Sequence, residues 1–166
     1  MGLFHFFWKQ RALTDQKQRA PSDPRSFSEN LEIVVARWRK ERIGLLPPEP
    51  PERVAEVFAS LGLKATGEML ELYAQLGGMR IMDDEDWRLW SLDEIREENK
   101  ESSPDGVLFS DYLIDCWRYR LKATADGEAE VLIDRSASDI PPRRIARSLN
   151  DFFAAYVEDA QEILND

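Results

Sequence analysis

Three segments in the first half of the chain repeat apolar residues at the spacing of an amphipathic helix. Ser28 is placed to cap the first helix, whose apolar side consists of Leu31, Val34, Val35, Trp38 and Ile43. The second begins near Pro51, because proline is tolerated in the first turn of a helix, and Gly62 ends it. Its apolar face consists of Val54, Val57, Phe58 and Leu61.

A third helix is predicted to start after Thr66 and to end at Gly77 and Gly78. Its apolar positions are Met69, Leu70, Leu72, Tyr73 and Leu76. Glycine adopts the left-handed conformation without a steric penalty, so the two adjacent glycines predict a sharp reversal of the chain. A strand is expected to follow.

After Met79 the pattern changes to alternation, which is typical of β-strands. Trp87, Leu89 and Leu92 alternate there, and an acidic tract interrupts the strand. Ser91 and Glu94 have the spacing of a capping box for a short helix that extends to about Lys100.

Three more strands are predicted over residues 107–113, 116–123 and 129–134, with a hairpin turn at 125–127 between the last two. Ser148 then begins a final helix, whose apolar stripe consists of Leu149, Phe152, Phe153, Tyr156, Val157 and Ile163. We expect one buried cluster of strand and helix residues, namely Trp117, Leu121, Val131, Phe152 and Tyr156. Helices followed by a meander and a closing helix predict a single α+β domain with a largely antiparallel or mixed sheet.

This domain is assigned to residues 27–166, and residues 1–26 to an extension with a flexible linker. Residues 9–26 are polar, contain two prolines and repeat no apolar face. The aromatic residues ahead of the linker are expected to pack on the domain or on a second copy; they are Phe4, Phe6, Phe7 and Trp8. The alternative is insertion into a membrane surface beside Lys9 and Arg11.

Charge is unevenly distributed along the chain, whose net charge is −10. Residues 1–45 carry nine basic and five acidic side chains, and residues 46–166 carry thirteen and twenty-seven. An acidic body repels phosphate, so nucleic acid is not an expected partner, whereas a basic protein surface is. No apolar run approaches the roughly 18 residues that span a bilayer.

Candidate chemistry is sparse, because His5 is the only histidine and Cys116 the only cysteine. Cys116 lies in a predicted strand and is expected to be a buried thiol, and a chain without an internal disulfide fits the reducing cytoplasm. We therefore expect no enzymatic activity, no metal site and no cofactor. A carboxylate pair acting as general acid and base is an alternative, since spatial pairing does not show in the sequence.

Four segments of the chain follow a pattern known from one protein family. They are the helix 70–73 that leads into Gly77 and Gly78, the stretch Trp90-Ser91-Leu92-Asp93-Glu94-Ile95, the tryptophan strand at 117–119, and Ile145-Ala146-Arg147-Ser148 before Phe152 and Phe153. Together they resemble the SUKH superfamily over roughly residues 45–160. The chain departs from the family pattern at Lys64-Ala65-Thr66-Gly67, where a Leu-Pro step is expected.

The resemblance implies a mixed or largely antiparallel sheet flanked by helices. It also implies an immunity protein that binds and neutralises a cognate toxin, for which a nuclease with a basic groove would suit an acidic body. The alternative within this fold is a regulatory or scaffolding protein that binds a housekeeping enzyme or polymer-synthesis machinery.

The acidic tract beside the first predicted strand is the candidate partner-binding site, because it combines negative charge with an aromatic side chain. Its residues are Asp83, Asp84, Glu85, Asp86, Trp87 and Arg88. We expect the carboxylates of Asp83, Asp84 and Asp86 to be exposed, so that their removal would leave the fold almost unchanged. The alternative is that Trp87 belongs to the core beside a solvated loop.

Overall fold

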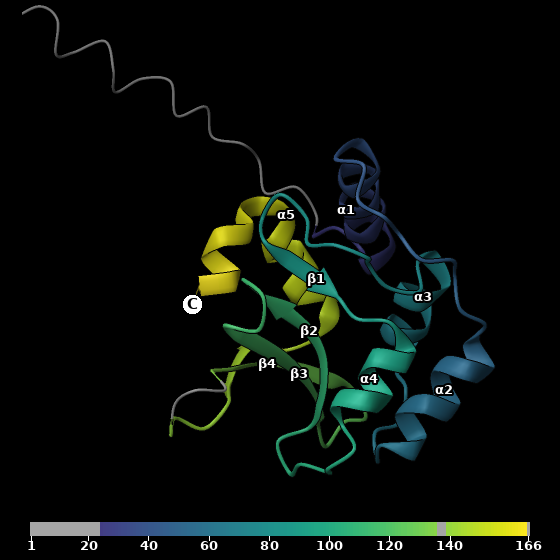
Figure 1. The fold of residues 1–166 in the computed structure, drawn as a ribbon, viewed down its shortest axis with the longest axis vertical. Helices are drawn as coiled ribbons and strands as arrows, with labels where there is room; N and C mark the ends of the chain where they lie inside the picture. Colours follow the sequence, from purple (N-terminus) through teal and green to yellow (C-terminus); the bar gives the residue numbers. More distant parts are fainter. Residues whose placement is uncertain (1–23, 136–138, 166) are drawn as a thin grey trace, which may run out of the picture.

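The computed structural model describes residues 24–135 and 139–165, and Figure 1 shows the arrangement of their elements. The helices are α1 (Phe27–Lys40), α2 (Pro51–Ser60), α3 (Gly67–Gln75), α4 (Leu92–Glu98) and α5 (Leu149–Asn165). The strands are β1 (Trp87–Leu89), β2 (Val107–Tyr112), β3 (Trp117–Ala123), β4 (Ala129–Asp134) and β5 (Arg143–Ala146). The predicted α+β class is confirmed.

The strands form one antiparallel meander in the order β1-β2-β3-β4-β5, so each strand pairs with its neighbours in sequence. The outer edge of β1 is also hydrogen-bonded, although no further strand of the described residues lies beside it. Met79 N–H donates to the Leu89 carbonyl oxygen and Asp83 N–H to the Trp87 carbonyl oxygen, both at 2.9 Å. The chain before β1 therefore covers the edge that β1 would otherwise expose.

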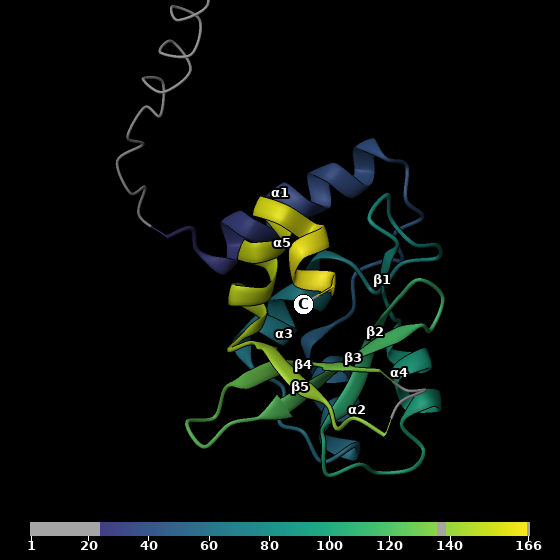
Figure 2. The same ribbon diagram turned by 90° about the vertical axis from the view of Figure 1, so that its left-hand side faces the viewer.

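The helices cover the two faces of the sheet unequally. α5 crosses one face over β4 and β5, and α1 lies side by side with α5 on the same side (Figure 2). α3 contacts α1, α2 and α5, whereas α4 packs on β2 from the other face and α2 packs on α4. Much of that second face is left to charged side chains from β3, β4 and β5.

Aromatic side chains fill the space between α1, α5 and the sheet. The indoles of Trp38 and Trp87 stack with their centroids 5.7 Å apart. Phe152, Phe153 and Tyr156 of α5 place their rings within 6 Å of the Trp87 ring. Such pairs stabilise a core by about 0.5–1.5 kcal/mol each beyond the area they bury.

Of the expected buried cluster, four members are buried and Trp117 is only half-buried. Trp117 lies opposite Tyr112 in the last pair of the β2–β3 ladder, where the sheet ends. Its indole stacks on Tyr112 at 5.3 Å, and the guanidinium of Arg135 lies over the indole ring at 5.1 Å. A position at the end of the sheet thus exposes a side chain that alternation alone placed in the core.

Side-chain caps begin α1, α3 and α4, and the cap of α1 differs from the predicted residue. Ser26 and not Ser28 caps α1, because the Ser26 side chain accepts from the Glu29 N–H while the Glu29 carboxylate accepts from the Ser26 N–H at 2.7 Å. The expected start of α3 after Thr66 and the expected capping box of Ser91 and Glu94 are both confirmed, and Thr66 is itself the N-cap of α3. Each start satisfies backbone N–H groups that have no partner inside the helix.

The predicted reversal after α3 needs both glycines, for different reasons. Gly78 has a left-handed φ of 128°, which glycine adopts without strain. A Cβ at Gly77 would lie 2.3 Å from the Pro47 carbonyl oxygen, so no larger residue fits there. The reversal brings the chain back beside residues 44–47, where Gly77 N–H donates to the Leu46 carbonyl oxygen at 3.1 Å.

Two features of the last third of the chain differ from the sequence prediction. β5 was not expected, and it adds an edge strand that begins directly after Pro141 and Pro142. α5 is interrupted at Asp159, whose backbone is extended with φ −153° and ψ 96°. The Asp159 carboxylate accepts from Glu162 N–H at 3.1 Å, as a helix N-cap does, so it begins the second half of α5.

The open sheet face carries the three cations that alternate along β3, namely Arg118, Arg120 and Lys122. Arg120 pairs with Asp134 on β4 at 2.6 Å, and Arg118 pairs with Glu98 and Asp115. On the neighbouring strands, Arg144 lies 3.4 Å from Glu130. These pairs neutralise the charges of this face locally, which leaves the net negative charge elsewhere on the molecule.

Candidate protein-binding site

Asp83 is an internal anchor of the acidic tract and is only 5% exposed. Its Oδ2 accepts from Trp38 Nε1 at 2.6 Å and from the Tyr156 hydroxyl. Its Oδ1 accepts from the backbone N–H groups of Glu85 and Trp87, both at 3.0 Å. The expectation of an exposed Asp83 is therefore wrong.

The environment of Asp83 affects its ionisation in two opposing ways. Burial raises the pKa of the Asp83 carboxyl, and the hydrogen bonds from Tyr156, Trp87 and the other donors act against that rise. Trp87 is completely buried as well, so two of the six expected partner-binding residues belong to the core. The hydrogen bonds to Asp83 fix where the rest of the tract lies.

The three following carboxylates face outward in the acidic loop, which we define as residues 80–86. Asp84 and Asp86 are exposed and Glu85 is half-buried. Two helices hold the backbone of this loop. At the end of α1, Glu41 Oε2 accepts from Asp84 N–H at 3.2 Å, and from α5, Gln161 Nε2 donates to the Glu85 carbonyl oxygen at 3.2 Å.

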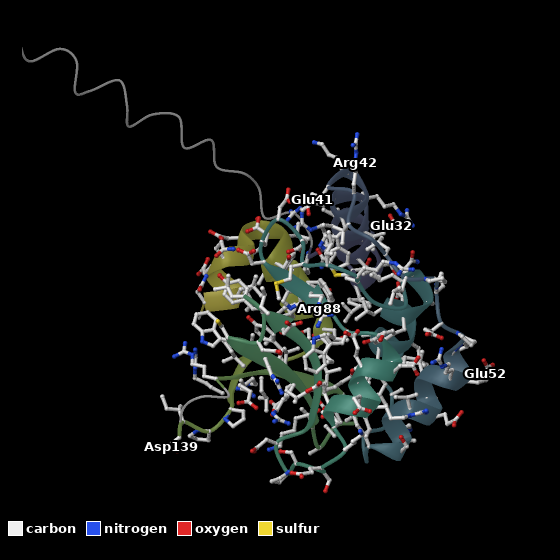
Figure 3. The ribbon with its side chains drawn as sticks, in the orientation of Figure 1. Glu32, Glu41, Arg42, Glu52, Arg88 and Asp139 are labelled. Carbon is white, nitrogen blue, oxygen red and sulfur yellow. The ribbon has the colours of Figure 1, made fainter. Side chains whose placement is uncertain are left out.

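Arg88, the last of the expected residues, lies on the open face of the sheet (Figure 3). Its guanidinium contacts Glu94 at 2.7 Å and Asp111 at 3.1 Å. Asp111 is buried and also accepts from Trp90 Nε1 at 2.5 Å. The charge of Arg88 is therefore balanced within the domain, and its guanidinium links β1, β2 and α4.

A segment that the sequence did not single out lies beside the acidic loop: the tip of the β2–β3 hairpin, residues 113–116. Leu113, Ile114 and Asp115 have left-handed φ angles of 49°, 51° and 64°. This conformation costs roughly 1–2 kcal/mol per residue for an L-amino acid, and it is rarest for a β-branched side chain such as Ile114. The hairpin tip is thus strained at Leu113 and Ile114, because aspartate, unlike these two, often adopts the left-handed conformation.

Neighbouring groups hold the hairpin tip in this conformation. Leu113 N–H donates to the Asp86 carbonyl oxygen at 3.0 Å, which joins the tip to the acidic loop. Asp115 N–H donates to Asp111 Oδ2 at 3.3 Å. Backbone strain that the surroundings maintain is concentrated at functional sites, which directs attention to this tip.

A groove of about 510 Å³ lies between the acidic loop and the hairpin tip. Its apolar wall includes Ile81, Leu113 and Ile114, which are 56%, 41% and 82% exposed. The remaining lining residues are Arg80, Met82, Asp86, Arg88, Asp111 and Asp115. Exposed apolar side chains bordered by charged groups have the composition of a protein-binding surface.

We expect the Ile114→Asn variant to be more stable than the natural chain. Asparagine tolerates the left-handed conformation, and little buried apolar area is lost from a side chain that is 82% exposed. The free energy of unfolding, measured in urea, should rise by about 1 kcal/mol. Ile140→Asn is the control, because Ile140 is 60% exposed without a left-handed φ. An equal rise in both variants would show that surface apolarity, and not strain, is relieved.

The sequence contained one sign of this tip that the prediction did not use. No glycine, asparagine or proline lies between β2 and β3, and Asp115 is the only residue there of a type that favours tight turns. The prediction instead assigned Leu113 and Cys116 to strands. Cys116 lies in the turn and is exposed, so the expectation of a buried strand thiol is wrong.

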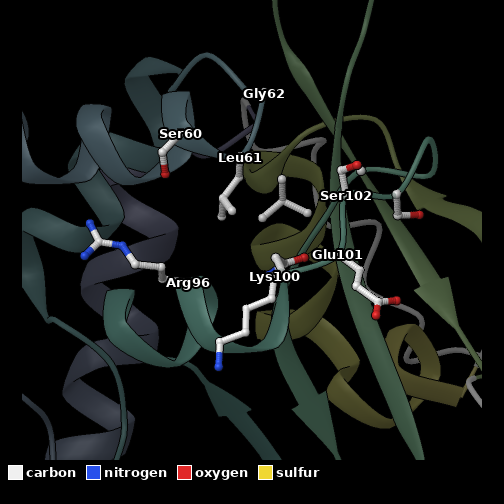
Figure 4. A pocket seen from close by; sticks show the side chains of 11 residues that line it. Ser60, Leu61, Gly62, Arg96, Lys100, Glu101 and Ser102 are labelled. Carbon is white, nitrogen blue, oxygen red and sulfur yellow. The ribbon is translucent and has the colours of Figure 1, made fainter.

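A second cavity, of about 460 Å³, lies between the end of α2, the end of α4 and the chain that leads to β2. Figure 4 shows the side chain of Leu61 pointing toward its middle, while the charged ends of Arg96 and Lys100 extend away from it. Its polar groups do not converge on one point, as they do in a ligand pocket. The groove beside the hairpin tip is therefore the better candidate site.

Within residues 24–135 and 139–165, histidine, cysteine and carboxylate side chains form no group of three that could hold a metal ion. The same residues include no helix that is long and apolar enough to cross a membrane. Comparison with known protein families finds no matching family, and comparison with curated proteins finds no matching relative.

Proposed function

We propose that this chain is an immunity-type protein-binding domain that neutralises a basic toxin domain by direct binding. The observation that carries the proposal is the strained hairpin tip, which presents Leu113 and Ile114 to solvent beside exposed carboxylates. An isolated domain gains nothing from this arrangement, because the strain costs stability and the apolar surface remains in water. A partner that buried the tip would recover the hydrophobic free energy.

The arrangement of apolar and acidic side chains around the groove suits association with a basic protein. Interfaces place apolar anchors at their centre and polar groups around them. Here Ile81 and Ile114 line the groove together with Asp86 and Asp115, and Asp84 is exposed in the same acidic loop. Residues 46–166 carry a net charge of −14 that would attract a basic surface over a distance. Charge and shape support a basic partner, and the resemblance to the SUKH superfamily supports a toxin as its class.

Capture of the partner is the first test. The tagged full chain should co-purify from its native host with a basic protein that binds it in a stoichiometric complex. A toxin domain would support the immunity function. A housekeeping enzyme or a polymer-synthesis protein would support the alternative regulatory function instead.

The association rate then tests the site. The variant with Asp84→Asn, Asp86→Asn and Asp115→Asn should associate about tenfold more slowly at low salt and depend less on ionic strength, because steering charges are lost. Asparagine suits the left-handed backbone of Asp86 and Asp115, so the fold should persist.

A control with the same change in charge separates steering by this site from the total charge. Glu52, Glu56 and Glu101 are exposed and lie on or near α2, away from the hairpin tip. Their replacement by glutamine should slow association much less. If both triple variants associated with the partner at equal rates, the acidic loop and the hairpin tip would not be the binding site.

A further inference from the structure

The aromatic and basic segment of residues 3–11 has no role in the function proposed above. It carries four aromatic side chains and two cations, Lys9 and Arg11, but no carboxylate. The expectation that it packs on the domain or on a second copy concerns residues outside the described part of the chain. Its chemistry is complementary to a surface that the structure does describe, namely the groove.

We propose that residues 3–11 bind in the groove of their own chain and cover the hairpin tip until a partner displaces them. The proposal needs the groove but does not depend on the partner proposed above. The aromatic side chains would contact the apolar wall of Ile81, Leu113 and Ile114. Lys9 and Arg11 would then lie close to the exposed carboxylates of Asp84 and Asp86.

The groove suits this occupant better than a purely apolar one. Its volume of about 510 Å³ is in the range of sites that receive compact ligands. Three carboxylates and two arginines line it, and one of these arginines, Arg88, is already paired with Asp111 and Glu94. Aromatic side chains supply large apolar contact area at a small cost in conformational entropy. A segment that combines aromatic residues with cations therefore matches both components of the groove.

The connection is long enough to reach the groove. α1 has 14 residues and is about 21 Å long, and its far end contacts the acidic loop through Glu41 and Asp84. The groove thus lies little more than one helix length from the start of α1. The twelve residues 12–23 can span about 40 Å when extended.

Tethering also relaxes the affinity that is required. A short connection gives the segment an effective concentration in the millimolar range at a site on its own chain. A weak intrinsic affinity is then enough to keep the groove mostly covered. The covered state would protect exposed apolar side chains from nonspecific association, and a partner would compete with the segment for the same groove.

Cys116 provides a direct test on the full chain, because it is the only cysteine, is exposed and lies in the hairpin tip. A nitroxide label attached to Cys116 broadens the NMR signals of nearby amides. We expect the amide signals of residues 3–11 to lose most of their intensity relative to the reduced label. Full intensity across residues 3–11 would overturn the proposal.

Two controls separate docking from other causes of broadening. In the Phe7→Ser, Trp8→Ser variant the intensity should return, and broadening that persists there would indicate unspecific proximity and overturn the proposal. An isotope-labelled Cys116→Ser chain mixed with an unlabelled chain that carries the nitroxide reports contacts between copies. Broadening that arises only in this mixture would replace the intramolecular occupant by a second copy.

A measurement without the nitroxide guards against disturbance of the groove by the label. The methyl signals of Ile81 and Ile114 should shift between the natural chain and the Phe7→Ser, Trp8→Ser variant, whereas those of Ile140 should not. Unchanged signals for Ile81 and Ile114 would overturn the proposal. None of these measurements involves a partner, so their failure would leave the proposed binding function standing, and the reverse also holds.

Discussion

Replacing Asp83 with asparagine should lower the free energy of unfolding by about 2–4 kcal/mol. The natural carboxylate offers only acceptors, and two donors point at each of its oxygens. In asparagine one of these oxygens is replaced by an NH2 group, which is itself a donor. The two protein donors at that position would then lose their acceptor. The groups affected would be either the Trp38 indole and the Tyr156 hydroxyl or two backbone N–H groups of the acidic loop.

Asp84→Asn is the matched control for this prediction. It makes the same chemical change one residue away at an exposed side chain, so its effect should stay within about 0.5 kcal/mol. Urea unfolding of the two variants under identical conditions compares them directly. Equal stabilities would mean that the hydrogen bonds to Asp83 do not hold the acidic loop.

Replacing Phe152 with alanine should cost about 3–5 kcal/mol of unfolding free energy. The Phe152 ring is completely buried and lies 5.8 Å from the ring of Trp87 and 6.0 Å from that of Tyr119. Its loss would leave a cavity where α5 crosses the sheet, and the rings around it cannot close that cavity without leaving their own contacts.

Calorimetry or urea unfolding measures this loss, and Glu162→Ala is its control on the same helix. Glu162 is exposed, so its removal should change stability by less than about 0.5 kcal/mol. A loss below about 1 kcal/mol for Phe152→Ala would contradict the packing of α5 described above.

Most helices and strands were predictable, because their signals are local. The capping residues Thr66 and Ser91 and the apolar spacing of α2, α3 and α5 depend only on neighbours in sequence. β5 was missed because it has four residues and two of them are arginines, so it shows no apolar alternation. Backbone hydrogen bonds pair it with β4, and the pattern of side chains along the sequence does not reveal such bonds.

The candidate site was predictable only in part, because its geometry depends on distant residues. Asp84 and Asp86 are exposed as expected, but Asp83 is buried by partners 45 and 73 positions away in the sequence, Trp38 and Tyr156. A run of four carboxylates does not show which of them a distant indole or phenol will hold. The contact between the acidic loop and the hairpin tip has the same character, since Asp86 and Leu113 meet only in the fold.

The position of α5 at the end of the domain has a consequence for synthesis on the ribosome. The meander can form as it emerges, because every strand pairs with the one before it. The aromatic cluster cannot form at that stage, because Trp38 and Trp87 become buried only when Phe152, Phe153 and Tyr156 pack against them. A nascent or truncated chain that lacks α5 therefore exposes two indoles and an incompletely paired Asp83, which makes it a target for chaperones and aggregation until α5 has left the ribosome.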